Sequence, residues 1–274
     1  MARADTATMG NSKGLGELWA RLRFLLLAII IYRLGTHIPV PGFDPERLAD
    51  LFTQNQGTFL GLFNMFSGGA LERMSILALG VMPYISASII MQLMSATVPS
   101  LEQLKKEGDS GRRQINQYTR YLTVALALFQ GTGLAVSFAT QGLAFEVNSL
   151  FYMVAIASLV SGAVFLMWLG EQISERGIGN GISLIIFAGI VAEIPRALVT
   201  TFELGRTGAV STFMILAIFV LLILTILFIV FMERALRKIL INYPKRQMGN
   251  KMYGGESSHL PLKINQAGVI PAIF

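Results

Sequence analysis

The chain has 274 residues, of which 53% are hydrophobic, 14% are charged and none is cysteine. A water-soluble domain of this length needs far more charge to cover its surface, so the composition excludes an ordinary soluble protein. The lack of cysteine excludes a disulfide framework and a thiolate metal site. Apolar stretches long enough to cross a hydrocarbon core of ~30 Å recur along the sequence and predict about six or seven crossings.

The first apolar run, Phe24 to Tyr32, predicts a retained helix over about Leu22 to Ile38. No small-residue cleavage site follows it, so we do not expect a cleavable signal peptide. Arg33 weakens this span, although its long side chain can reach toward an interface. Five stronger spans follow, and a seventh helix is expected to begin after Lys263: Ile76 to Val98, Tyr121 to Ala139, Leu150 to Leu169, Ile182 to Val199 and Ser211 to Met232.

These runs are too long and too evenly apolar for the strands of a membrane barrel. Only helices or closed barrels satisfy the backbone within lipid. The predicted fold class is therefore an all-α, polytopic transmembrane helix bundle. Most of the 22 Lys and Arg residues fall in the N-terminal segment and in alternate loops, which predicts a cytoplasmic N-terminus over residues 1–20 by the positive-inside rule.

Two features interrupt the pattern of straight spans. Phe59 to Ala70 is apolar but only twelve residues long, and it ends at Gly68-Gly69. A stretch of this length is more often re-entrant or buried than spanning, and the alternative is an interfacial helix on the outer leaflet. Pro83 lies inside the next predicted span, where it removes a backbone hydrogen bond and is expected to bend the helix. A short half-helix before a bent helix favours a backbone that lines a cavity.

The predicted spans hold few ionisable residues. Ile76 to Val98 and the third, fourth and sixth helices contain none, and the fifth has none before Glu193. Ion-coupled transporters usually place such residues at the membrane midplane, so their absence disfavours coupled transport and intramembrane catalysis. A secondary transporter for a small solute remains the alternative function, and a membrane scaffold without a transport role is a third.

No motif predicts chemistry. His37 and His259 fall in separate loops on opposite sides of the membrane, and no set of residues has metal-ligand or nucleophile-base spacing. The glycines between Arg176 and Gly181 favour a tight turn over a nucleotide loop, since no strand precedes them and no lysine follows. We therefore predict no catalytic residue, no metal, no cofactor and no enzymatic activity.

Residues 233–263 form a long and basic predicted cytoplasmic loop. Such a loop can set topology and attract anionic lipid headgroups, or it can dock a negatively charged partner such as ribosomal RNA. Composition does not separate the two interpretations.

Several motifs, in order along nearly the whole chain, closely resemble the bacterial SecY family of protein-conducting channels. They are Asn64 to Leu71, Met82 to Ile90, Lys105 to Gly108 with Gly111 to Arg113, Trp168 to Ile173, Arg176 to Gly181, His259 to Asn265 and Ala267 to Phe274. The resemblance implies the pore-forming subunit of a protein translocation channel in the bacterial plasma (inner) membrane. Such a subunit passes unfolded polypeptides across the membrane and releases apolar segments into it.

The resemblance also implies residue roles. Four aliphatic residues would form the pore ring: Val81, Ile85, Ile186 and Ile273. Residues 59–70 would be the re-entrant plug, with Phe59, Leu62, Phe63, Asn64, Met65, Phe66, Ser67, Gly68 and Gly69. Ser86 and Gln92 would lie toward the lateral gate. Bulky aliphatic side chains suit a pore ring because they close around a passing chain and exclude water when empty.

The implied partners are the accessory subunits SecE and SecG, the SecA motor, the ribosome, nascent or signal-bearing polypeptides and anionic lipids. Docking of the ribosome or motor would use Arg176, Lys245, Arg246 and Lys251. Asn250 stands where the family usually has the first residue of an adjacent basic pair, which puts its contribution in doubt.

Family members have ten spanning helices in two inverted halves. The resemblance therefore implies that residues 21–199 are the first five-helix half. Residues 200–274 would then hold the sixth helix, the basic loop 233–263 and the start of the seventh helix. With only these parts, the chain is not expected to form a complete channel.

Overall fold

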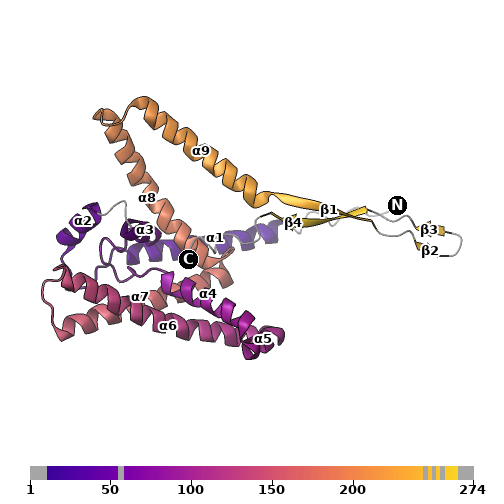
Figure 1. Cartoon of the computed structure of the whole chain (residues 1–274), viewed down its shortest axis with the longest axis horizontal. Coiled ribbons are helices and arrows are strands. Elements are labelled where there is room, and N and C mark those ends of the chain that lie inside the picture. The colour runs from indigo at the N-terminus through magenta and orange to yellow at the C-terminus, as the bar shows by residue number, and fades with distance from the viewer. Residues whose placement is uncertain (1–10, 55–58, 243–245, 249–250, 254–256, 265–274) are drawn as a thin grey trace. The chain divides into compact units, whose positions relative to one another are not determined.

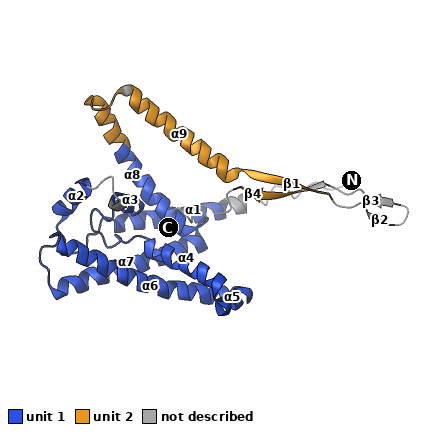
Figure 2. Cartoon of the chain, in the orientation of Figure 1, with its two compact units in different colours: residues 1–197 blue, residues 198–274 orange. Residues whose placement is uncertain are grey.

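The computed structural model describes residues 11–54, 59–242, 246–248, 251–253 and 257–264 (Figure 1). The chain divides into two compact units, residues 1–197 and 198–274 (Figure 2). The described residues of the first unit form seven helices and most of an eighth: α1 (Asn11–Gly35), α2 (Pro45–Gln54), α3 (Phe59–Phe66), α4 (Met82–Thr97), α5 (Pro99–Lys106), α6 (Asp109–Thr140), α7 (Ser149–Arg176) and α8 (Gly181–Arg206). The second unit begins within α8 and contains α9 (Thr212–Arg234) and four short strands.

Four helices among the described residues are long and apolar enough to cross a membrane: α6, α7, α8 and Phe213–Arg234 of α9. They contain the last four of the five stronger predicted spans, which are thereby confirmed as helices; only Ser211 lies just outside, as the N-cap of α9. The predicted seventh helix, after Lys263, lies outside the described residues. The first predicted span also folds as a helix, α1. It is not among the four because arginines at positions 21, 23 and 33 interrupt its apolar sequence.

The prediction for the second span was wrong in two respects. Residues 67–81 form turns, apart from a single β-bridge between Ser75 and Pro39, and the helix begins only at Met82. Pro83 therefore lies in the first turn of α4, where its missing N–H leaves no hydrogen bond unmade, and it does not bend the helix. The sharp change of direction, 97°, comes instead between α4 and α5 at Pro99. The pair α4 and α5 counts as a fifth candidate span if it is taken as one.

Two apolar clusters form the core of the first unit. The first joins α2, α6 and α7 with the chain before α4, and its buried side chains include Leu48, Met74, Phe138, Phe151 and Leu159. The second joins α1, α4, α7 and α8. Its buried side chains include Tyr32, Leu77, Leu166, Ile173 and Ile185.

The basic segment after α9 contains strands, which the all-α prediction did not include. β1 (Leu236–Asn242) pairs antiparallel with β4 (Ser257–Lys263), with Leu236 opposite Lys263 and Asn242 opposite Ser257. Further out, β2 (Arg246–Met248) pairs with β3 (Lys251–Tyr253). Isoleucines at positions 239 and 241 favour extended backbone, and the two-stranded sheet allows Pro261 a place in β4 because every strand is an edge strand.

Candidate functional site

The predicted plug segment starts as the short helix α3 and ends in a glycine turn. Gly68 and Gly69 have φ angles of 65° and 77°, in the left-handed region that favours glycine. The Gly69 N–H donates to the Asn64 carbonyl over 2.9 Å, which caps the end of α3. With eight residues, α3 is too short to cross a membrane.

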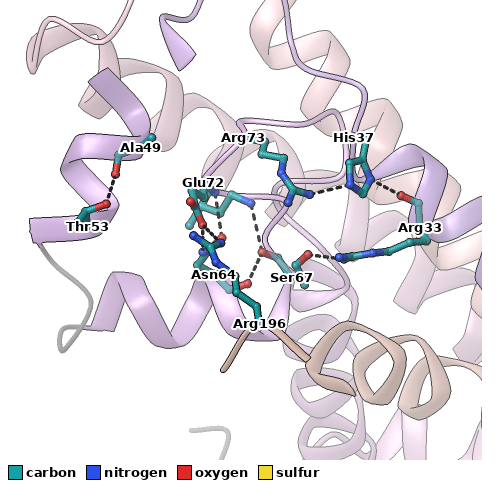
Figure 3. A network of polar contacts seen from close by, with 11 residues as sticks. Arg33, His37, Ala49, Thr53, Asn64, Ser67, Glu72, Arg73 and Arg196 are labelled. Atoms are coloured by element: carbon teal, nitrogen blue, oxygen red, sulfur yellow. Dashed lines mark hydrogen bonds and ion pairs between the residues drawn. The ribbon is translucent and has the colours of Figure 1, made fainter. Parts of the chain in front are cut away.

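Two adjacent side chains of α1 bind the backbone of this turn, and Figure 3 shows Arg33 reaching it. The Tyr32 hydroxyl donates to the Ser67 carbonyl over 3.1 Å, and Nη1 of Arg33 donates to the Gly68 carbonyl over 2.7 Å. Arg33 thus has a partner within the first unit, on a helix whose sequence otherwise suggests contact with lipid. The sequence marked Arg33 as unusual but did not identify the turn as its partner.

A second set of polar contacts ties α3 to the residues that follow the turn. Nδ2 of Asn64 donates to Oε2 of Glu72 over 3.1 Å, and the Glu72 backbone N–H donates to Oδ1 of Asn64 over 2.9 Å. Glu72 also lies 3.7 Å from Nη1 of Arg196 on α8, as an ion pair (Figure 3). Of these residues, the sequence predicted a role only for Asn64.

His37 follows the end of α1 and contacts two arginines, Arg33 on α1 and Arg73 after the glycine turn. Its Nδ1 is 2.8 Å from the Arg33 carbonyl, and its Nε2 is 3.0 Å from Nη1 of Arg73 (Figure 3). A neutral imidazole with its proton on Nδ1 fits both contacts, because Nδ1 then donates and Nε2 accepts. His37 therefore connects α1 to the chain after the glycine turn.

Three of the four predicted pore-ring residues come together in the second apolar cluster. Val81 is buried there as the N-cap of α4, and Ile85 and Ile186 pack against the cluster half-buried. Ile273 lies outside the described residues. The two predicted lateral-gate residues, Ser86 and Gln92, both lie on α4, the first half-buried and the second exposed.

The predicted docking residues fall in two places. Arg176 is exposed in the last turn of α7. Arg246 lies on β2 and Lys251 on the facing strand β3, opposite Tyr253 and Met248 respectively. Lys245 and Asn250 lie outside the described residues. Across the described ranges, no group of three or more His, Cys, Asp or Glu residues is placed to hold a metal ion.

The fold matches solved protein-conducting channels. One match, to a structure described as a protein conducting channel, covers all of this chain and 58% of that chain, with a TM-score of 0.66 and 18% identity. A second match, to Sec61 in a canine ribosome-channel complex, covers 87% of this chain and 52% of that one, with a TM-score of 0.60. A third match, with a TM-score of 0.58, is a SecY protein whose plug domain is described as stabilising the closed state. The chain is thus a mostly helical membrane protein with the fold of these channels.

Sequence comparison identifies the family. The SecY family model matches residues 75–274. The protein translocase subunit SecY of Pseudomonas aeruginosa is 61% identical over 274 residues, which is all of this chain and 62% of the relative. The SecY subunit of Escherichia coli K12 is 55% identical over 279 residues, again all of this chain and 63% of the relative. The chain belongs to the SecY family, and it spans less than two thirds of the length of these relatives.

Proposed function

We propose that this chain supplies the plug and much of the pore wall of a protein translocation channel, as the pore-forming subunit of a bacterial inner-membrane translocon. One observation carries the proposal. A helix too short to cross a membrane ends in a turn that polar contacts attach to α1, in the same unit as the cluster of Val81, Ile85 and Ile186. Such a segment can close a path through the bundle and can leave it without unfolding a spanning helix.

A secondary transporter of a small solute is less well supported. Its site requires charged or polar groups that converge at the midplane. The predicted pore-ring residues Val81, Ile85 and Ile186 are instead aliphatic, and they pack with one apolar cluster. Aliphatic walls can enclose chains of any sequence because they make no directional bond to them.

The test uses a chimera in which this chain replaces the matching segment of the E. coli relative, produced with the other channel subunits. Removal of residues 59–70 is expected to raise the ion permeability of membranes that contain the chimera, while the chimera still translocates a secreted protein. The intact chimera is the control. Background permeability after the deletion would contradict the plug assignment.

The docking role is a separate proposal. Arg246 and Lys251 lie on facing strands of one hairpin, and Lys245 precedes them in the sequence. A basic hairpin supports docking to ribosomal RNA or to an acidic surface of the SecA motor. Lys245→Glu with Arg246→Glu is expected to weaken binding of ribosomes or motor to the chimera by at least about tenfold at low salt.

The control for this charge reversal is the same pair changed to glutamine, which removes charge without adding repulsion and is expected to weaken binding less. Binding of the glutamate variant at the parent level in low salt would leave only a role in topology or lipid attraction. Purification of the chimera from mild detergent should also recover SecE and SecG, and their absence would contradict the assignment as a translocon subunit.

A further inference from the structure

We propose that Tyr32, Arg33 and Gly189, here called the latch, hold the glycine turn of the plug segment in its closed position. The proposal rests on the function proposed above. These three residues set the fraction of time for which the turn is detached from α1 and α8 in the closed channel.

The two α1 side chains bind consecutive carbonyls, those of Ser67 and Gly68. The bond from Arg33 is charge-assisted and short, at 2.7 Å, which makes it stronger than a neutral hydrogen bond. Tyr32 is only 2% exposed. Its hydroxyl therefore bonds in surroundings with little water to compete for the Ser67 carbonyl.

Gly189 lets the turn lie directly against α8. A Cβ at this position would lie 3.0 Å from the Tyr32 hydroxyl and 3.2 Å from the Phe66 carbonyl oxygen. A Cβ on Gly68 would in turn lie 2.9 Å from the Cα of Gly189. The two glycines thus bring the backbones of the turn and of α8 into contact, within reach of the Tyr32 hydroxyl.

Apolar side chains anchor the flanks of the turn more firmly than the two residues just before it. Phe63 and Leu71 pack in the first apolar cluster. Met65 and Phe66, just before the turn, remain 40% and 38% exposed. The turn itself is buried, but Gly68 and Gly69 have no side chain to pack, so it depends more on the bonds from Tyr32 and Arg33. Loss of those bonds is expected to free the turn first.

The chain contains no cysteine, which allows a direct measurement of opening. In a cysteine-free version of the chimera, purified with its partner subunits, Ser67→Cys introduces one thiol at a position that is 6% exposed. The rate of labelling by a water-soluble maleimide is proportional to the open fraction when opening and closing are fast. Every variant carries this cysteine, so the rates compare directly.

Arg33→Gln is expected to raise the labelling rate about tenfold, because it removes the hydrogen bond that the charged guanidinium donates to the Gly68 carbonyl. Gly189→Ala is expected to raise it as well, since its methyl group displaces the turn from α8. Arg33→Lys keeps the charge but has a different reach and geometry, so its rate should fall between those of the parent and Arg33→Gln.

Matched controls lie on helices of the same unit. Arg21→Gln removes an exposed arginine of α1 that pairs with Glu17, and Gly133→Ala adds a methyl group where nothing lies within 4 Å. Both should label within about twofold of the parent. Gel filtration and thermal unfolding of each complex identify variants that have lost their fold, and only folded complexes enter the comparison.

Parent-like labelling of folded Arg33→Gln and Gly189→Ala would overturn the latch, even if removal of residues 59–70 makes the membrane permeable. Faster labelling of both variants, together with an impermeable deletion variant, would support the latch and contradict the proposed seal. The two proposals therefore fail by different measurements.

Discussion

At the scale of single residues, glycines set how closely the helices of the first unit approach one another. Gly162 on α7 is one such case, because a Cβ there would overlap the backbone carbonyl oxygen of Ile76. Backbone cannot move aside as a flexible side chain can. The close packing of α7 against the chain that leads into α4 therefore requires glycine.

Gly162→Ala is expected to destabilise the protein, since overpacking of this kind typically costs about 1–3 kcal/mol. Gly131→Ala on α6 is the matched control: a Cβ there makes only ordinary contacts, the nearest at 3.6 Å to Leu159. Alanine is also the better helix former by about 0.5–1 kcal/mol. Thermal unfolding in detergent should therefore rank Gly162→Ala below the parent and Gly131→Ala at or above it. Equal melting temperatures for the two variants would contradict this account of α7 packing.

At the scale of elements, the hairpin differs from the helices in what stabilises it. The pair of β1 and β4 is a sheet of only two strands, and its residues Leu240 and Leu260 are about half exposed. A two-stranded hairpin without a further strand or helix to cover it is only marginally stable in water. The helix α7, by contrast, buries Leu159, Leu166 and Ile173 completely.

Amide hydrogens of β1 and β4 are therefore expected to exchange at least about 100-fold faster than those in the middle of α7. Hydrogen exchange followed by mass spectrometry on the isolated channel complex measures both regions in one experiment. Equal protection would mean that another part of the complex covers the hairpin. Addition of ribosomes or motor should slow exchange in the hairpin if the docking proposal holds.

The helices were largely predictable because a membrane span requires a long apolar run in the sequence. The start of α4 was not, because Ile76 to Val81 is as apolar as a helix and yet folds as turns. Its backbone is held by distant partners, as in the bond from the Ile76 N–H to the Ile38 carbonyl. The polar contacts of Tyr32 and Arg33 also join residues 35 positions apart, and a periodicity within one helix carries no information about such pairs.

At the scale of the whole molecule, the distribution of basic residues predicts which loops face the cytoplasm. Two glycines in different loops allow a direct test. Gly108 and Gly208 both have positive φ angles, 77° and 74°, and both have open space where a side chain would lie. Short insertions are best tolerated at exposed turns of this kind.

An epitope inserted after Gly208 is expected to be accessible to antibody from the outer side of the membrane. The same epitope after Gly108 should be accessible only from the cytoplasmic side, because the positive-inside rule places that basic loop inside. Antibody binding to intact spheroplasts and to inverted vesicles of the chimera distinguishes the sides. A result with both epitopes on one side would contradict the predicted topology.

The bonds from Tyr32 and Arg33 end on main-chain carbonyls of the turn, which every amino acid possesses. The side chains of the plug segment can therefore change without changing the two bonds that attach its turn to α1. Substitutions at Met65 or Phe66 can accumulate among relatives without loss of these two bonds, provided that glycines remain at positions 68 and 69. The latch proposal therefore predicts that positions 65 and 66 vary more among relatives than Tyr32 and Arg33 do.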